Sequence, residues 1–357
     1  MKPPATVSGE ADRLDYLIVG QGLAGSVLAL VMRKRGLRFR VVDNAPSSSA
    51  TRVAAGILNP VTGRKIVKSW RADELLPRAF AFYRDAEREL GGRWLRERMI
   101  HRYLVTDEER ETWEKKRDRE EWRGVIGPLP PESGFGLREG LDGFCIHGGG
   151  MLDTSEFLNS VGGLLLREDR LLKADLAMEG MRVSPDGIEW EGLRAARIIF
   201  CEGHRASRNP YFSWLPFRHA KGEVLTLRWD GPDDGRIHNC GKWLVPLGGG
   251  KAIAGSTFKW NDMSELPTEA GREEIVKSLD HVLKAKPEVI RQQAGIRPIL
   301  KGSRPVAGPH PAHTSVAIFN GLGAKGVSLA PFFADQLLDH LEKGAPLDEE
   351  IDPRRNW

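Results

Sequence analysis

Three glycines, at positions 20, 22 and 25, separate a short apolar run from a stretch of small and apolar residues. This GxGxxG spacing lets the chain turn tightly, approach a phosphate with its backbone and pack a helix closely on a strand. The run "DYLIVG" predicts a buried strand, and we expect the following helix to end at Gly36. The N-terminus of that helix offers N–H groups and a positive dipole end to an anion. The pattern therefore predicts a dinucleotide site.

An acidic residue completes this pattern. The run "LRFRVVD" predicts a second strand that ends at Asp43, 23 residues after Gly20. A carboxylate at that place accepts hydrogen bonds from ribose hydroxyls, and it would repel a 2′-phosphate, which argues against NADP. The spacing does not separate NAD from FAD. The same GxGxxG spacing recurs once, in "GLGAKG" at 321–326, but no second strand that ends in an acidic residue follows it, so we do not expect a separate nicotinamide domain.

Length and composition describe an ordinary globular protein. A chain of 357 residues with 40% hydrophobic and 29% charged residues suggests about two domains. The 53 basic residues are interspersed with 49 acidic ones, so the net charge of +4 is a weak argument for nucleic acid. Cys145, Cys201 and Cys240 have no metal-ligand spacing, and we expect buried thiols and no metal. The first apolar segment contains three glycines and ends in "RKRG", so we expect a cytoplasmic protein without a membrane span.

Downstream patterns predict the remaining elements. "ARIIFCEGH" is a second buried-strand pattern, and "GEVLTLRW", "KWLVPLGGG" and "KAIAGSTFKW" predict antiparallel strands with hairpin glycines. "ADELLPRAFAFYRDAEREL" and "TDEERETWEKKRDREEW" predict amphipathic helices, and "DTSEF" predicts a capped helix start. "SVAIFNGLGAKGVSLAPFF" predicts a strand, a glycine loop and a helix, and thus a second helix N-terminus that could face a ligand.

In this order of segments the chain resembles the FAD-dependent amine and amino-acid oxidases of the D-amino-acid oxidase and glycine oxidase superfamily. The resemblance covers about residues 14–345. Its markers are the GxGxxG run, "AAGILNP", "IHGGGMLDTSEFL", "IIFCEGH", "KGEVLTL", "WLVPLGGGKAIAGSTF", "AGIRPILKGSRPVAG" and "GLGAKGVSLAP". Each marker is degenerate alone, whereas eight in the same order are specific. The last two also resemble the oxidoreductase module of the bifunctional enzyme that modifies the wobble uridine of tRNA.

The resemblance implies an α/β fold, with a Rossmann-type FAD-binding domain and a discontinuous substrate domain built on an antiparallel sheet. The FAD-binding domain would comprise 12–76, 145–215 and 295–345, and the substrate domain 77–144 and 216–294. FAD would lie extended, with its isoalloxazine where the two domains meet. The "TRVAAGILNP" loop has no histidine and "GIRPILKGSRP" no cysteine that could tether a flavin. We therefore expect FAD to be bound non-covalently.

The resemblance also implies which residues contact the cofactor. The glycine turn would hold the pyrophosphate, and the end of the second strand would hold the adenosine ribose. A small-residue loop would lie beside the flavin, and a strand ahead of Gly203 would contact the adenine. The expected set is Gly20, Gly22, Leu23, Ala24 and Gly25; Asp43 and Asn44; Ala54, Ala55 and Gly56; Leu176 and Gly203; and Gly323, Ala324, Lys325, Gly326 and Val327 at the start of the last helix.

Two cations are the candidate catalytic residues. Lys325 and the helix start around it would stabilise the negative charge of reduced flavin at N1 and O2; the alternative is a solvated lysine. Arg297 in "GIRP" matches the arginine that clamps the substrate carboxylate in glycine-oxidase-like relatives, because a guanidinium fork binds a carboxylate bidentately; the alternative is a structural arginine paired to an acid. Arg64 and Lys65 could add a second positive contact, or lie in solvent. Glycine oxidases have an arginine where this chain has Ala324, so the resemblance does not identify the substrate.

These observations predict an FAD-dependent oxidoreductase that oxidises a C–N bond of a small-molecule amine or amino acid by hydride transfer to flavin N5. One alternative is a flavoenzyme that modifies the wobble uridine of tRNA, which requires a basic face for phosphates. Another is a flavoprotein module without turnover. The sequence does not choose the electron acceptor or the oligomeric state.

Overall fold

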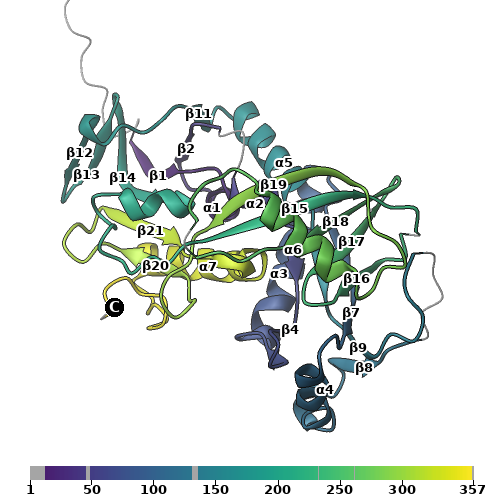
Figure 1. The fold of residues 1–357 in the computed structure, drawn as a ribbon. Helices are drawn as coiled ribbons and strands as arrows, with labels where there is room; N and C mark the ends of the chain where they lie inside the picture. The colour runs from purple at the N-terminus through teal and green to yellow at the C-terminus, as the bar shows by residue number, and fades with distance from the viewer. Residues whose placement is uncertain (1–12, 46–48, 131–135, 232, 261, 356–357) are drawn as a thin grey trace, which may run out of the picture. The chain divides into compact units, whose positions relative to one another are not determined.

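The computed structural model describes residues 13–45, 49–130, 136–231, 233–260 and 262–355 (Figure 1). The chain forms two compact units, each assembled from segments far apart in the sequence. Unit 1 comprises Met1–Ser47, Leu158–Arg218 and Pro298–Trp357, and unit 2 comprises Ser48–Phe157 and His219–Arg297.

Both units alternate along the chain as the predicted domains do, but at different boundaries. Residues 48–76, 145–157 and 295–297 belong to unit 2 by their contacts, and residues 216–218 belong to unit 1. Which unit binds which ligand is a separate matter, and the assignment of an FAD-binding and a substrate domain stays a prediction.

Unit 1 contains an eight-stranded mixed sheet with a parallel centre (Figure 1). β1 pairs in parallel with β2 on one side and β14 on the other; β11 continues beyond β2, and β21 pairs with the end of β14. Antiparallel additions are β13 and β12 beside β14, and β20 beside β21. The strands span Leu14–Val19 (β1), Phe39–Asp43 (β2), Leu171–Lys173 (β11), Met181–Ser184 (β12), Gly187–Trp190 (β13), Leu193–Phe200 (β14), Val306–Pro309 (β20) and Val316–Asn320 (β21).

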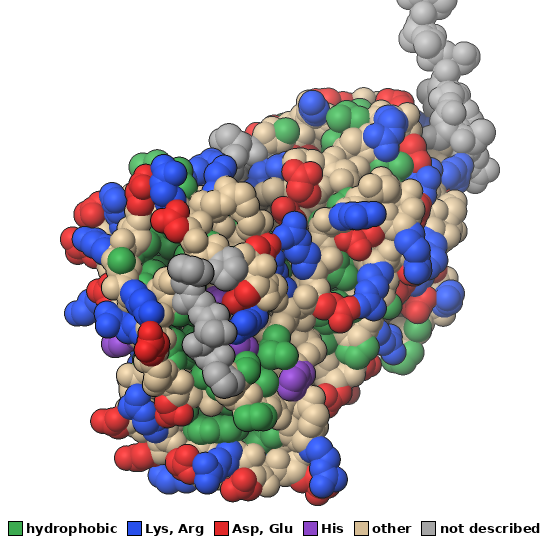
Figure 2. Space-filling view, turned by 90° about the vertical axis from the view of Figure 1, so that its right-hand side faces the viewer, with side chains coloured by type: hydrophobic (Ala, Val, Ile, Leu, Met, Phe, Trp, Pro, Cys, Tyr) green, Lys and Arg blue, Asp and Glu red, His purple; other side chains and the backbone are tan. Residues whose placement is uncertain are grey.

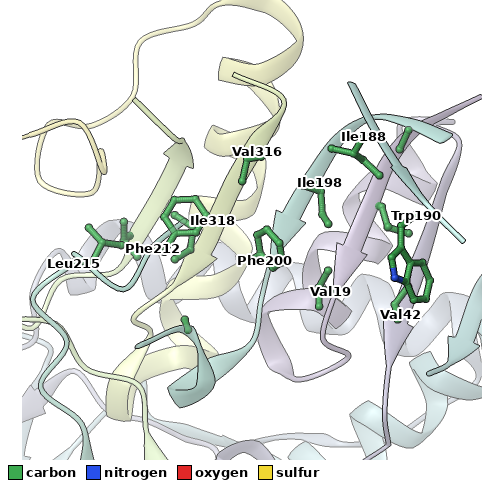
Figure 3. Close-up of a cluster of buried hydrophobic side chains, with 14 of the residues drawn as sticks. Val19, Val42, Ile188, Trp190, Ile198, Phe200, Phe212, Leu215, Val316 and Ile318 are labelled. Atoms are coloured by element: carbon green, nitrogen blue, oxygen red, sulfur yellow. The ribbon is translucent and has the colours of Figure 1, made fainter. Parts of the chain in front are cut away.

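The apolar strand patterns of unit 1 supply its core. Side chains from β1, β2, β14 and β21 gather in one buried cluster, in which Figure 3 labels Val19, Val42, Phe200 and Ile318. Helix α1 (Leu23–Lys34) is buried from Leu23 to Met32 and contacts α7 (Gly326–Lys343). This burial is the reason why "LAGSVLALVM" is apolar on all sides rather than on one stripe.

Unit 2 contains a second eight-stranded sheet in the order β19-β15-β18-β17-β16-β7-β9-β8. All its pairs are antiparallel except β16–β7, so the predicted antiparallel sheet is right apart from that pair. Its strands span Met99–Tyr103 (β7), Ile126–Pro128 (β8), Gly143–Ile146 (β9), Ala220–Arg228 (β15), Arg236–Asn239 (β16), Trp243–Gly248 (β17), Lys251–Gly255 (β18) and Val289–Arg297 (β19).

Smaller elements complete the fold. Two short sheets, β3-β10-β6 and β4-β5, belong to unit 2, and α5 begins in unit 2 and ends in unit 1. The bounds are Ala50–Val53 (α2), Ile57–Leu58 (β3), Val61–Thr62 (β4), Val67–Lys68 (β5), Ala72–Leu90 (α3), Leu95–Glu97 (β6), Asp107–Glu114 (α4), Gly150–Leu152 (β10), Thr154–Arg167 (α5) and Glu269–Leu279 (α6), with 3-10 turns at Glu120–Trp122, Met178–Gly180, Gly203–Arg208 and Gly323–Lys325.

The predicted α/β class is confirmed, as are the helix over 72–90 and the capped start of α5, where the Asp153 carboxylate accepts from the Glu156 N–H. The predicted helix "TDEERETWEKKRDREEW" is wrong beyond Glu114, because its polar second half has no apolar face to bury. All three cysteines are buried, as expected. Among the described residues, no helix combines the length and the apolar content that crossing a bilayer requires.

Candidate functional site

The parallel strands of unit 1 end at one common edge. Val19 pairs with both Val42 and Phe200, and Phe200 pairs with Ile318, so the carboxyl ends of β1, β2, β14 and β21 lie in register. In open α/β sheets, ligands bind at this edge, where the strand order reverses. Here β2 lies on one side of β1 and β14 on the other, so the reversal falls between β1 and β14.

The predicted glycine turn follows β1 at this edge. Gly20 has φ +100°, and a Cβ there would lie 2.6 Å from the Cys201 carbonyl oxygen. A Cβ on Gly25 would lie 1.9 Å from the Gly20 carbonyl oxygen, so α1 approaches the turn as closely as a glycine allows. Gly22 is the N-cap of α1, with no side chain capping the helix. The positive end of α1 therefore begins directly at the turn.

The end of β2 is tied to the same turn. The Asp43 carboxylate accepts the Gln21 N–H on Oδ2 and the Ala45 N–H on Oδ1, both at 2.7 Å. A carboxylate has about four acceptor positions, so capacity remains for ribose hydroxyls. Gln21, which the sequence reasoning missed, donates from Nε2 to Ser26 Oγ at 3.0 Å. The only feature of the sequence that could have identified Gln21 is its position between Gly20 and Gly22.

Asn44 and Leu176 lie beside the end of β2. Asn44 Nδ2 donates to Asp175 Oδ1 at 3.2 Å. The placement of Leu176 in a strand is wrong, because β11 stops at Lys173, opposite Asp43, where β2 itself ends and offers no further partner. Leu176 lies in the following loop, and its side chain packs on the core. Its predicted backbone contact with adenine stays a prediction.

The end of β14 carries Gly203 and a half-buried acid, Glu202. The Gly203 carbonyl accepts from Nδ2 of the buried Asn320 at 2.9 Å, which ties this loop to the end of β21. Burial raises the pKa of Glu202, and its Oε2 accepts from Asn209 Nδ2 at 2.7 Å. Glu202 was not singled out from the sequence, where "CEGH" gives no hint that the acid lies half-buried next to the Gly20 turn.

The residues around Lys325 form the entry into α7. The 3-10 turn Gly323–Lys325 leads directly into the helix, with Gly326 and Val327 buried and Ala324 exposed. Burial lowers the pKa of Lys325, and the charge of Arg304 lowers that pKa further. Lys325 is thus a half-buried cation rather than a solvated one. Arg304, from the "KGSRP" stretch, was missed because nothing in its sequence surroundings sets it apart.

Arg297 ends β19 in unit 2, opposite Ala220 of β15. Its guanidinium lies over Gly222, where a Cβ would come within 2.1 Å of Nη2. Nη1 donates to the Thr257 carbonyl at 3.2 Å and Nη2 to Ser256 Oγ at 2.6 Å. These contacts hold the planar fork in one orientation.

No acid neutralises this guanidinium among the described residues. Both hydrogen-bond acceptors of Arg297 are uncharged, and burial lowers the pKa of Arg297 to about 10. By contrast, the buried Arg98 pairs with Asp233 and the buried Arg102 with Glu109. A half-buried cation without a carboxylate is suited to an anionic ligand. The alternative of an arginine paired to an acid is therefore not supported by the described part of the chain.

Two buried charges on β15 hold the described residues 256–260 and 262–268, which we call the 256–268 segment. Lys221 Nζ donates to Asp262 Oδ2 at 2.6 Å and Ser264 Oγ at 3.0 Å, and its side chain is wholly buried. The Glu223 carboxylate accepts from both the N–H and the hydroxyl of Thr268 at 2.8 Å. Sequence reasoning missed both residues, although charges inside the apolar pattern "KGEVLTL" were an available signal.

The predicted flavin loop, Ala54 to Gly56, follows α2. Gly56 has φ +65°, and a Cβ there would lie 2.0 Å from the Leu152 carbonyl oxygen. A Cβ on Gly295 would lie 3.1 Å from Ala50 Cα, so α2 packs closely on β19. Because alternate residues of a strand share a face, α2 and the Arg297 side chain lie on the same face of β19.

Arg64 and Lys65 lie at the exposed tip of the turn between β4 and β5. Lys116 Nζ donates to the Lys65 carbonyl and, at 3.0 Å, to the Ile66 carbonyl. Neither predicted side chain forms a hydrogen bond or ion pair with a described residue, so the structure does not bring them to Arg297. Nor do the described residues contain a cluster of three or more His, Cys, Asp or Glu side chains that could hold a metal ion.

The sequence matches a known protein family over most of its length. The family model DAO, described as FAD dependent oxidoreductase, matches residues 15–340. The chain is 23% identical over 352 residues to the tRNA 5-methylaminomethyl-2-thiouridine biosynthesis bifunctional protein MnmC of Marinobacter nauticus, covering 91% of this chain and 55% of that protein.

Two solved structures are similar over almost their whole length. Glycine oxidase from Geobacillus kaustophilus gives a TM-score of 0.79 at 21% identity, covering 93% of this chain and 95% of that chain. Iminodiacetate oxidase (IdaA) from Chelativorans sp. BNC1 gives a TM-score of 0.75 at 20% identity, covering 95% and 100%. At these identities the structures show a shared fold.

Proposed function

Because this chain belongs to the DAO family of FAD-dependent oxidoreductases, we propose that it oxidises the carbon–nitrogen bond of an amino acid whose carboxylate is held by Arg297. The observation that carries this proposal is the uncompensated guanidinium, fixed by Ser256 and Thr257 and without an acidic partner among the described residues. Two similar solved structures are an oxidase of glycine and an oxidase of iminodiacetate, and both of these compounds carry a carboxylate next to an amine.

The carboxyl edge of unit 1 fits FAD. Gly20 and Gly25 occupy backbone positions that a side chain would fill, as the approach of a pyrophosphate to a helix N-terminus requires. Asp43 would hold the adenosine ribose, and Lys325 at the start of α7 would hold positive charge at the flavin end. When bound, FAD supplies a two-electron acceptor. Non-covalent binding remains part of the proposal.

Arg297 orients the substrate. Two parallel charge-assisted hydrogen bonds fix the carboxylate and, through it, the α-carbon and its C–H bond. The amine reacts as the neutral base: its lone pair forms the C=N bond while the C–H electron pair leaves as hydride, and one proton leaves the nitrogen. Water then hydrolyses the imine to a carbonyl compound and an amine or ammonia. These reaction steps need no pair of acid and base side chains, and our proposal assigns none.

Two alternative functions have less support. Modification of tRNA is suggested by the name of the Marinobacter relative, but this chain spans 55% of that protein. Figure 2 shows Lys and Arg side chains interspersed with Asp and Glu over the face that it views, rather than the basic surface that phosphate binding needs. A flavoprotein without turnover would not account for the Arg297 guanidinium, which has no acidic partner among the described residues.

The test compares amino acids with their decarboxylated amine analogues in anaerobic reduction of the bound flavin. Arg297→Ala removes both hydrogen bonds, which are worth roughly 3 kcal/mol together, so the Kd of the acids should rise about a hundredfold. Arg297→Lys should recover only part of the loss, because an ammonium cannot form the fork. Arg64→Ala is the matched control and should behave as the wild type.

The amines decide the interpretation. A loss confined to the acids supports the proposal. An equal loss for acids and amines would make Arg297 a structural residue, and an amine without a carboxylate would then become the better substrate. If neither class reduces the flavin while the protein binds tRNA with a steep salt dependence, the tRNA alternative replaces the proposal.

A further inference from the structure

The 256–268 segment is an irregular stretch that is nevertheless firmly held. Its start is fixed by Thr257, whose Oγ1 accepts the Glu223 N–H at 2.9 Å. Its middle is fixed by the ion pair of Lys221 with Asp262, and its end by the bonds from Thr268 to Glu223. Lys221 and Glu223, two buried charges of β15, therefore hold the segment at its start, middle and end and restrict where its other side chains lie.

These side chains are unusually apolar for an exposed segment. Four of the nine exposed large hydrophobic residues in the described part of the chain lie between positions 258 and 266. They are Phe258 (43% exposed), Trp260 (41%), Met263 (47%) and Leu266 (73%). Fixing such side chains in water by means of two buried charges is unfavourable unless a ligand or partner covers them.

One of the four, Phe258, lies against the Arg297 guanidinium, and a second, Trp260, packs on Phe258. The Arg297 Cζ is 5.1 Å from the centroid of the Phe258 ring, and the Phe258 and Trp260 rings meet edge to face at 4.8 Å. A carboxylate on the guanidinium would therefore bring the side chain of an amino acid within reach of the aromatic pair. A basic side chain there would be repelled by Arg297, and glycine has no side chain to cover the rings.

We propose that Phe258 and Trp260 form the side-chain subsite of the substrate, and that the substrate is an amino acid with an apolar side chain. The inference rests on the proposed function, because it uses Arg297 as the carboxylate anchor. Phe258 is then the specificity-determining residue, whereas Lys221 and Asp262 are positioning residues that act through the segment.

The experiment measures the binding of unreactive acids to the FAD-loaded enzyme, by calorimetry and by the change in flavin absorbance. The probes are acetate, butanoate, hexanoate and phenylacetate. Each methylene that reaches an apolar surface adds about fourfold in affinity, so Kd should fall along the series. In Phe258→Ala and Trp260→Ala the series should flatten while acetate binds as before. Ile290→Ala, which removes an equally exposed apolar side chain of unit 2, is the matched control and should keep the wild-type slope.

The outcomes separate this inference from the proposed function. Arg297→Ala should weaken all four acids by the same factor, and that result concerns the anchor alone. If wild-type affinity is flat along the series, or if Phe258→Ala weakens acetate as much as phenylacetate, the subsite is refuted although the anchor stands. Anaerobic flavin reduction by glycine and by phenylalanine adds a second readout: a faster reduction by glycine in the wild type would also overturn the inference.

Discussion

At the carboxyl edge of unit 1 the backbone sets the positions of the candidate residues, whereas around Arg297 in unit 2 side chains do so. Gly25 approaches the Gly20 carbonyl so closely that a Cβ would lie 1.9 Å from the oxygen. At Gly222 a Cβ would instead meet the guanidinium of Arg297, 2.1 Å from Nη2. Glycine thus allows a close approach of the backbone in unit 1 and leaves space for a side chain in unit 2. The two regions should therefore respond differently to a glycine-to-alanine substitution.

The difference follows from what each region binds. A pyrophosphate is recognised by N–H groups and a helix dipole, which every sequence possesses once its backbone takes the right path. A substrate carboxylate and side chain are recognised by particular side chains, which must be held by others. Buried Lys221 and Glu223 do this for the 256–268 segment, and Gly222 between them leaves the opposite face free for Arg297.

The largest effect is expected at the glycine turn. Gly25→Ala places a Cβ against a carbonyl oxygen that cannot move without breaking the turn, so we expect loss of folded, FAD-containing protein. Gly22 has extended backbone dihedrals that other residues adopt, so Gly22→Val should fold and yet fail to bind FAD. Flavin content and thermal unfolding measure the two effects. Full flavin content in Gly22→Val would show that no pyrophosphate lies at the turn.

Gly222→Ala is the matching substitution in unit 2. The added methyl group must displace the guanidinium, which is the end of a flexible side chain, so the fold and the flavin content should be retained. Carboxylate binding should weaken by roughly tenfold or more, in line with an overpacking cost of about 1–3 kcal/mol. Calorimetry with phenylacetate measures this. An unchanged Kd would mean that the carboxylate does not depend on the observed orientation of Arg297.

These two substitutions also show what the sequence could and could not predict. Gly20, Gly25 and Asp43 were found from spacing alone, because their roles depend on positions within 23 residues of one another. Arg297 was found only through a resemblance. Lys221 and Asp262 are 41 residues apart, and although the charge inside "KGEVLTL" was a local signal for Lys221, nothing in the sequence pairs it with Asp262. Leu176 was placed in a strand through the resemblance, and the sequence does not show that the strand before it, β11, ends at Lys173.

A smaller effect is expected at Lys325, which belongs to unit 1 but would act through its side chain. Removing its charge in Lys325→Met should lower the reduction potential of bound FAD by roughly 30–60 mV, equivalent to one charged interaction of about 1.5–3 kcal/mol. Burial lowers the pKa of this lysine, so the difference from the wild type should shrink as the pH rises through that pKa. Spectroelectrochemical titration at several pH values measures both. An unchanged potential would place the side chain away from the flavin.

The smallest effect concerns the ion pair that holds the 256–268 segment. The hydrogen bond from Lys221 is the main cause that lowers the pKa of Asp262 to about 2, from an ordinary value of 3.8. The unfolded chain therefore binds a proton more readily than the folded one, so the stabilisation is fully present above about pH 4 and is lost as the pH falls through about 2. Since 38% of the Asp262 side chain is exposed, solvent screens the pair and the contribution is modest.

Urea unfolding at pH 6, 4 and 2.5 compares the wild type with Asp262→Asn. The variant should be less stable at pH 6. The difference in the free energy of unfolding between the wild type and the variant should become smaller between pH 4 and 2.5. Asp107→Asn, which removes a carboxylate that is 96% exposed, is the control. A gap that stays constant with pH would show that Asp262 is not held by Lys221. The region around Arg297 would then, like the glycine turn, owe its shape to the backbone, and the contrast between the two regions would disappear.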